Sequence, residues 1–187
     1  EAGADDYVCK PYEANELKVR VRAGHRIVDM QRSLLATQQE LEFKARHDML
    51  MKIWNRTAMT DLMERELARA KRDSSSFGVM LADVDRFSNV TSRSDSTTGD
   101  EILGQVARRI QSFVRPYDSV GRYTDEKFLI ICPNCNAEQA TIVAERIRKG
   151  VSREPVIGAD CEVSLTVSLG VTVGDPSIHD DAESILR

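Results

Sequence analysis

The segment from Gly121 to Ile130 constrains the fold more than any other part of the chain, because it predicts a β-hairpin. Strand-forming side chains fill residues near 118–123 and 127–132, and a short tip of threonine, aspartate and glutamate separates the two runs. A tight hairpin joins strands that run in opposite directions. At least part of the sheet is therefore expected to be antiparallel.

The segments around the hairpin alternate between helical and strand periods. We expect a helix after Asn55 that ends at the polar run 73–76, a buried strand over 77–82, and helices over 101–115 and 137–149. Apolar residues alternate through 161–173, which predicts one long strand with one face in the core. This order favours the α/β (α+β) class, with a palm-like antiparallel sheet in the order β-α-β-β-α-β and helices on one face.

The stretch from residue 13 to residue 46 predicts a long helix that precedes this domain. It contains no proline and a single glycine, which allows a helix of about 30 residues. Ile27, Leu34 and Leu41 recur every seven residues, a pattern typical of a two-helix coiled coil, so we expect a homodimer through this helix. A single amphipathic helix that packs on its own domain stays open as the alternative.

The charge of the chain excludes two classes of partner. The 187 residues carry a net charge of −4, and 26 basic and 30 acidic side chains are interspersed. No field of a single sign is therefore present to bind nucleic acid or an anionic membrane surface. No run approaches the roughly 18 apolar residues of a membrane span, and we expect a cytoplasmic protein.

Two of the four cysteines, Cys132 and Cys135, have the spacing of a redox or zinc pair. A tetrahedral zinc site would need a second pair of ligands, and no second pair with this spacing accompanies them. We interpret both as small residues at the end of a buried strand.

Two carboxylates, Asp83 and Asp85, stand at the end of the buried strand. Side chains two residues apart on a strand lie on one face, so we expect these carboxylates to converge where a hard cation such as magnesium could bind. Glu126 at the hairpin tip could add a third. Solvated surface acids or helix-capping groups are the alternative for the same spacing.

From His47 onward the chain resembles the GGDEF domain of diguanylate cyclases. The resemblance rests on six matches in the order of that family: His47-Asp48-Met49-Leu50, Asn55-Arg56, Asp83-Val84-Asp85-Arg86-Phe87, Gly99-Asp100, Gly121-Arg122-Tyr123 and Ser164-Leu165-Thr166-Val167-Ser168-Leu169-Gly170-Val171. It implies a scaffold that joins two GTP molecules into cyclic di-GMP. It also implies a magnesium set of Asp83, the Val84 carbonyl and Glu126, and a guanine contact at Asp100.

The signature of that family, Gly-Gly-Asp/Glu-Glu-Phe, is replaced here by Thr124-Asp125-Glu126-Lys127-Phe128. Thr124 and Asp125 add bulk where glycine leaves room, and Asp125 adds negative charge beside a polyanionic substrate. The family's phosphate-contacting lysine, guanine-reading asparagine and loop histidine fall at Ser88, Thr91 and Ser96. We expect a degenerate site that is no longer an active enzyme, with Glu126, Asp100 and Lys127 as vestiges of the catalytic set. A weakly active cyclase is the alternative.

A second site of the family, which binds the product, matches better. Its Arg-x-x-Asp motif falls at Arg115-Pro116-Tyr117-Asp118, and its further arginines fall at Arg146 and Arg69. Arginine can donate to guanine O6 and N7 while a carboxylate accepts from the amine edge. We expect these four residues to bind cyclic di-GMP. A module that binds no nucleotide and contacts only proteins is the alternative.

The start of the chain resembles the end of a response-regulator receiver domain, on the residues Gly3-Ala4-Asp5-Asp6-Tyr7-Val8 and Lys10-Pro11. The resemblance implies phosphorylation by an upstream histidine kinase in bacterial two-component signalling. We expect three parts: the receiver end at 1–26, a coiled-coil linker at 27–46 and the degenerate GGDEF domain at 47–187. The family's final helix is expected beyond residue 187.

Overall fold

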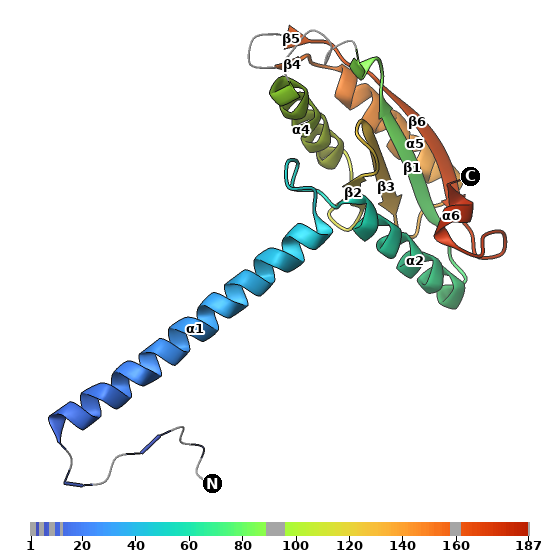
Figure 1. The fold of residues 1–187 in the computed structure, drawn as a ribbon. Helices are drawn as coiled ribbons and strands as arrows, with labels where there is room; N and C mark the ends of the chain where they lie inside the picture. Colours follow the sequence, from blue (N-terminus) through green and yellow to red (C-terminus); the bar gives the residue numbers. More distant parts are fainter. Residues whose placement is uncertain are drawn as a thin grey trace. The chain divides into compact units, whose positions relative to one another are not determined.

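The computed structural model describes residues 3, 6–7, 10–11, 13–88, 96–157 and 162–186. The chain forms two compact units, residues 1–45 and residues 46–187. Figure 1 shows the elements in chain order: α1 (Ala14–Arg46), α2 (Arg56–Asp73), β1 (Phe77–Val84), α4 (Ser96–Ser112), β2 (Ser119–Arg122), β3 (Lys127–Cys132), α5 (Ala137–Ser152), β4 (Val156–Ile157), β5 (Glu162–Val163), β6 (Val167–Gly174) and α6 (Ala182–Ile185).

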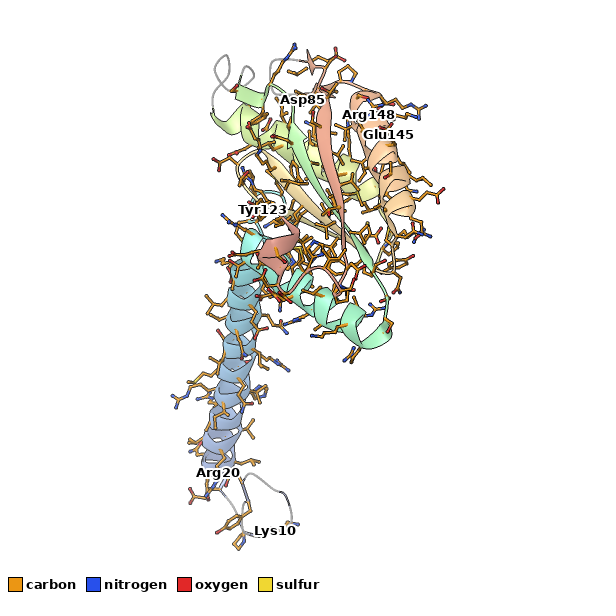
Figure 2. The ribbon with its side chains drawn as sticks, turned by 90° about the vertical axis from the view of Figure 1, so that its right-hand side faces the viewer. Lys10, Arg20, Asp85, Tyr123, Glu145 and Arg148 are labelled. Atoms are coloured by element: carbon orange, nitrogen blue, oxygen red, sulfur yellow. The ribbon has the colours of Figure 1, made fainter. Side chains whose placement is uncertain are left out.

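The first unit consists mainly of α1, which confirms the predicted long helix and is continuous from Ala14 to Arg46. None of its residues is buried, and Ile27, Leu34 and Leu41 are 56%, 69% and 60% exposed. Figure 2 draws its side chains and labels Arg20. Ile27, Leu34 and Leu41 form the expected seam of the coiled coil, and its pairing with a second copy stays a prediction. Within the segment that resembles the end of a receiver domain, residues 4–5 and 8–9 lie outside the described residues.

The second unit begins at the end of this helix and continues into α2. The Asn55 side chain accepts a hydrogen bond from the backbone N–H of Ala58 at 2.9 Å and so caps the start of α2, the helix that the sequence predicted after this residue. The helix ends where Ser74 takes a left-handed conformation with φ of 49°.

Within the described ranges, no helix is both long enough and apolar enough to cross a membrane.

The main sheet confirms the predicted antiparallel topology. Its strands are ordered β2-β3-β1-β6, and each neighbouring pair is antiparallel. The expected hairpin is formed by β2 and β3, with Arg122 opposite Phe128. In the centre, Asp83 of β1 lies opposite Lys127 of β3 on one side and opposite Ser168 of β6 on the other. The register therefore decides which side chains surround the acidic end of β1.

Helices cover both faces of this sheet, so the expectation of helices on one face was wrong. On one face α4 and α5 pack against Met80, Phe128 and Ile130, and on the other α2 and α6 pack against Val79 and Leu129. The reason is that residues 77–82 and 128–132 are apolar without alternation. A strand that is apolar on both faces needs cover on both.

The long strand expected at 161–173 is also wrong, because two separate strands occupy its described part. Glu162–Val163 forms β5 and pairs with β4, whereas Val167–Gly174 forms β6 and pairs with β1. The β1–β6 ladder ends at the pair Val84 and Val167, and Arg86 then turns the chain with φ of 56°. Residues just before Val167 therefore have no β1 partner, although Leu165 is still buried.

Candidate functional site

The hairpin tip closes without any need for glycine. The backbone N–H groups of Tyr123 and Thr124 donate to the Lys127 carbonyl at 2.8 and 3.3 Å. Neither Thr124 nor Asp125 has a positive φ, and both are exposed. The loss of two glycines thus leaves the backbone unstrained and adds two side chains to the space beside the tip.

The Arg122 side chain links the hairpin tip to Asp48. Its guanidinium donates to the Asp125 carbonyl at 2.8 and 3.2 Å and forms an ion pair with Asp48 at 3.1 Å. Asp48 also accepts from the backbone N–H groups of Leu50 and Met51. Partial burial raises the pKa of Asp48, but these hydrogen bonds and the Arg122 charge outweigh it and hold the pKa below its usual range. Asp48 and Arg122, two residues that match the family, thus stabilise the fold next to the hairpin tip.

Lys127 forms an ion pair with Asp83 where β1 and β3 meet beside the tip. The Lys127 Nζ lies 2.8 Å from Asp83 Oδ2, and each side chain is 39% exposed. The hydrogen bond to Asp83, its charge, and the charge of Glu126 raise the pKa of Lys127 above its usual value. An ammonium group therefore occupies the place in front of the carboxylate where the sequence predicted a metal ion.

The expected convergence of Asp83 and Asp85 is not observed. Asp85 accepts hydrogen bonds from the hydroxyls of Thr166 and of Ser168, the latter at 2.7 Å, and both lower the pKa of its carboxyl group. Asp83 faces β3 and Asp85 faces the chain around β6, so the two carboxylates diverge. Within the described residues, no group of three His, Cys, Asp or Glu side chains is placed to hold a metal ion. Because the Lys127 ammonium group lies against Asp83, the expected set of Asp83, the Val84 carbonyl and Glu126 does not fit magnesium in this arrangement.

The structure describes only some of the other residues to which the family resemblance assigns GTP binding. Asp100 lies on α4 and is partly buried, and Ser88 is exposed after β1. Thr91 and the side chain of Ser96 lie outside the described residues. Of these four residues, the structure describes the side chains of Asp100 and Ser88, and the guanine contact at Asp100 stays a prediction.

The Arg-x-x-Asp motif forms a closed turn just before β2. The Asp118 N–H donates to the Arg115 carbonyl at 3.0 Å, and Asp118 Oδ2 accepts from the Arg115 N–H at 2.8 Å. The Arg115 guanidinium donates to the Tyr117 hydroxyl at 3.0 Å. The turn thus fixes the carboxylate and leaves the guanidinium on the surface.

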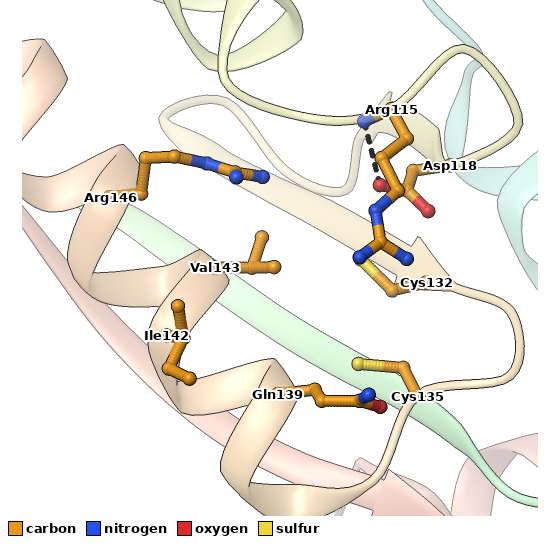
Figure 3. A pocket seen from close by; sticks show the side chains of 8 residues that line it. All are labelled: Arg115, Asp118, Cys132, Cys135, Gln139, Ile142, Val143 and Arg146. Atoms are coloured by element: carbon orange, nitrogen blue, oxygen red, sulfur yellow. Dashed lines mark hydrogen bonds between the residues drawn. The ribbon is translucent and has the colours of Figure 1, made fainter.

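This turn lines a pocket together with the start of α5, shown in Figure 3. Arg146 extends from α5 toward the turn, so Arg115, Asp118 and Arg146 come together as the sequence predicted. Asp118 Oδ1 is buried and has no hydrogen-bond partner within the described residues. A buried carboxylate oxygen without a donor costs about 1–3 kcal/mol, so a ligand that donates to it would be favoured.

Arg69 is not part of this pocket. It lies on α2, which packs on the opposite face of the sheet from α5. Its guanidinium approaches Glu66 at 3.5 Å and Asp73 at 3.6 Å on its own helix. The structure therefore brings three of the four predicted arginine and aspartate residues together and leaves Arg69 apart.

Sequence reasoning missed the rest of the pocket lining, which consists of Cys132, Cys135, Gln139, Ile142 and Val143. Both cysteines are buried free thiols near the end of β3, where the sequence placed them. Burial first, and then the nearby Asp118 charge, raises the pKa of the Cys132 thiol. The available signal was the helical spacing from residue 139 to residue 146, which puts these side chains on one face of α5.

Comparisons with known proteins agree with this geometry. A model of the family described as "Diguanylate cyclase, GGDEF domain" matches residues 45–187. The response regulator PleD of Caulobacter vibrioides is 32% identical over 194 residues, which cover 100% of this chain and 41% of PleD. The chain thus spans well under half the length of that relative.

Two crystal structures of DgcB from Caulobacter crescentus, both in complex with c-di-GMP, have a similar fold. The structure of its coiled coil and GGDEF domain is 24% identical with a TM-score of 0.78, and covers 91% of this chain and 88% of that chain. The structure of its GGDEF domain alone is 26% identical with a TM-score of 0.70, and covers 76% and 84%.

Proposed function

This chain belongs to the GGDEF family of diguanylate cyclase domains, and from that premise we propose that it is a signalling effector that binds cyclic di-GMP without making it. The binding site is the pocket of Arg115, Asp118 and Arg146. The two ends of the domain differ in their match to the family: the hairpin end, which would condense GTP, departs from the family's signature, whereas the pocket end, which would bind the product, matches the family's Arg-x-x-Asp motif.

The observation that carries the proposal is the unpartnered Asp118 Oδ1 in a pocket with two arginines. The amine edge of guanine offers N–H donors, and its O6 and N7 are acceptors for a guanidinium. A guanine base in this pocket would supply the missing donor to Asp118 and acceptors to Arg115 and Arg146. The DgcB domain, with 26% identity, was solved with c-di-GMP, which supports this choice of ligand.

The hairpin end supports the absence of cyclase activity. Condensing two GTP molecules places several phosphate groups and their metal ions beside the tip. Here Thr124 and Asp125 project there, and Lys127 neutralises Asp83. The Asp125 carboxylate would repel phosphate oxygens, and no third carboxylate within the described residues completes a metal set.

The upstream part of the chain is proposed to control this domain. PleD, which matches the whole chain, is a response regulator. We assign residues 1–26 to the end of a receiver domain that a histidine kinase phosphorylates. The exposed seam of Ile27, Leu34 and Leu41 would pair with the same helix of a second copy, so that phosphorylation acts on the dimer.

Calorimetric titration of cyclic di-GMP tests the proposal. We expect saturable binding to the wild-type chain and a loss of affinity in Arg146→Ala. Arg148→Ala is the matched control, because Arg148 lies on the same helix, where it pairs with Glu145 (Figure 2), and is not among the residues that line the pocket. The absence of binding heat would favour a protein-interaction module instead.

A second assay addresses catalysis. The wild-type chain is incubated with GTP and magnesium, and the product is resolved by chromatography. We expect no cyclic di-GMP above the level of a protein-free control. Product formation that Glu126→Gln abolishes would establish the weakly active cyclase in place of the effector.

A further inference from the structure

We propose that the ammonium group of Lys127 is the resident cation of the acidic end of β1 and replaces a divalent metal ion there. The domain would then fold without magnesium. This inference concerns a different site from the cyclic di-GMP pocket and does not depend on it.

The backbone register imposes the contact. Asp83 and Lys127 are the last opposed pair of the β1–β3 ladder. Opposed residues of antiparallel strands place their side chains on the same face, with Cβ atoms roughly 5 Å apart. The Lys127 Nζ reaches Asp83 Oδ2 at 2.8 Å from this position. Any lysine at residue 127 is therefore held in front of that carboxylate as long as the sheet is intact.

The second carboxylate at this end of the strand is already satisfied. Asp85 accepts from Thr166 and Ser168, and its backbone N–H donates to the Thr166 carbonyl at 3.0 Å. These two hydroxyl bonds hold the Asp85 carboxylate against Thr166 and Ser168 rather than toward Asp83. Magnesium prefers octahedral oxygen coordination, and one carboxylate that is already paired with an ammonium group does not supply it.

Charge adds to this geometric argument. A divalent ion near Asp83 would have to displace Lys127 or lie within about 5 Å of its positive charge, and repulsion at that distance weakens binding by about tenfold even in a medium as polar as water. Glu126 is close enough for its charge to act on Lys127 as well. Lys127 is thus paired directly with Asp83 and also lies within reach of the Glu126 charge.

Titration with Mn²⁺, followed by the electron paramagnetic resonance signal of the free ion, tests the inference. Mn²⁺ takes the same oxygen ligands as magnesium. We expect Lys127→Gln to bind Mn²⁺ at least about tenfold more tightly than the wild-type chain, and Asp83→Asn added to that variant to remove the gain. Lys127→Arg keeps the cation and should match wild type. Lys149→Gln is the charge-matched control, because Lys149 is an exposed lysine that pairs with Glu145 on α5.

Two results would overturn the inference: Mn²⁺ binding to wild type as tight as to Lys127→Gln, or a gain in Lys127→Gln that persists after Asp83→Asn. A measurement on the unaltered fold covers the case in which Lys127→Gln does not fold. The melting temperature of the wild-type chain should be the same with magnesium and with a chelator. A magnesium-dependent rise that Asp83→Asn abolishes would show a resident metal site.

Discussion

Asp118→Asn should weaken cyclic di-GMP binding without unfolding the domain. The asparagine amide has the shape of the carboxylate, and its oxygen can still accept from the Arg115 N–H, the bond that closes the turn at 2.8 Å. The change falls on Oδ1, which is buried and unpartnered in the described structure. At that position an amide nitrogen presents donors to the donors of guanine. Asp118→Asn thus separates recognition from folding.

The magnitude follows from the loss of a hydrogen bond to a charged acceptor. Such a bond contributes about 1.5–3 kcal/mol, which corresponds to about 10- to 150-fold in Kd. Calorimetry measures the affinity, and thermal unfolding measures the stability of the same samples. Asp125→Asn makes the same charge change at the exposed hairpin tip, which does not line this pocket, and should leave Kd unchanged. A Kd for folded Asp118→Asn within about twofold of wild type would refute the assignment of guanine to Asp118.

Three further predictions address the fold and the dimer. Gly121→Ala should lower the melting temperature, because the added Cβ would lie 2.2 Å from Met59 Cγ and 2.8 Å from the Trp54 carbonyl oxygen. Such overpacking costs about 1–3 kcal/mol. Gly24→Ala is the control and should not lower the melting temperature, because open space surrounds Gly24. Asp48→Asn should cost about 1 kcal/mol at neutral pH. Because the Asp48 pKa is lowered on folding, this difference in unfolding free energy should be present above about pH 4 and disappear as pH falls through the folded pKa; a difference independent of pH would contradict the ion pair. Leu34→Asp should convert a dimer into a monomer in light scattering, whereas Gln39→Asp on the outer face should not; an unchanged mass for Leu34→Asp would exclude the coiled coil.

The sequence predicted the elements whose signal is local. The long helix α1 depends on the absence of proline, and the β2–β3 hairpin depends on a short turn between two strand-forming runs; both are confirmed. The break between β5 and β6 was missed because the apolar alternation continues through Leu165. Strand pairing there is decided by where β1 ends, which is a tertiary property that no local pattern encodes.

At the candidate sites, too, the sequence predicted local structure but not the partners that come from other strands. Spacing placed Asp83 and Asp85 on one face, but it could not show that each would find a different neighbour, Lys127 for one and two hydroxyls for the other. For the Arg-x-x-Asp motif, the spacing itself forms the turn, so Arg115 and Asp118 lie together in one pocket, and their binding of cyclic di-GMP stays a prediction. A motif that makes its own local structure is predictable, whereas one that depends on partners from other strands is not.

Strand β3 explains why one end of this domain can change while the other is kept. Lys127 begins the strand beside Asp83, and Cys132 ends it in the Arg-x-x-Asp pocket, about 17 Å away at the rise of an extended chain. Residues 128–132 between them are buried, so the strand is held by the core rather than by either site. The substitutions at the tip meet solvent and need no special backbone conformation, so they leave this packing intact. Sites this far apart with no shared partners respond independently to substitution. The proposed loss of GTP condensation at the hairpin is therefore compatible with the proposed binding of cyclic di-GMP at the other end of the same strand.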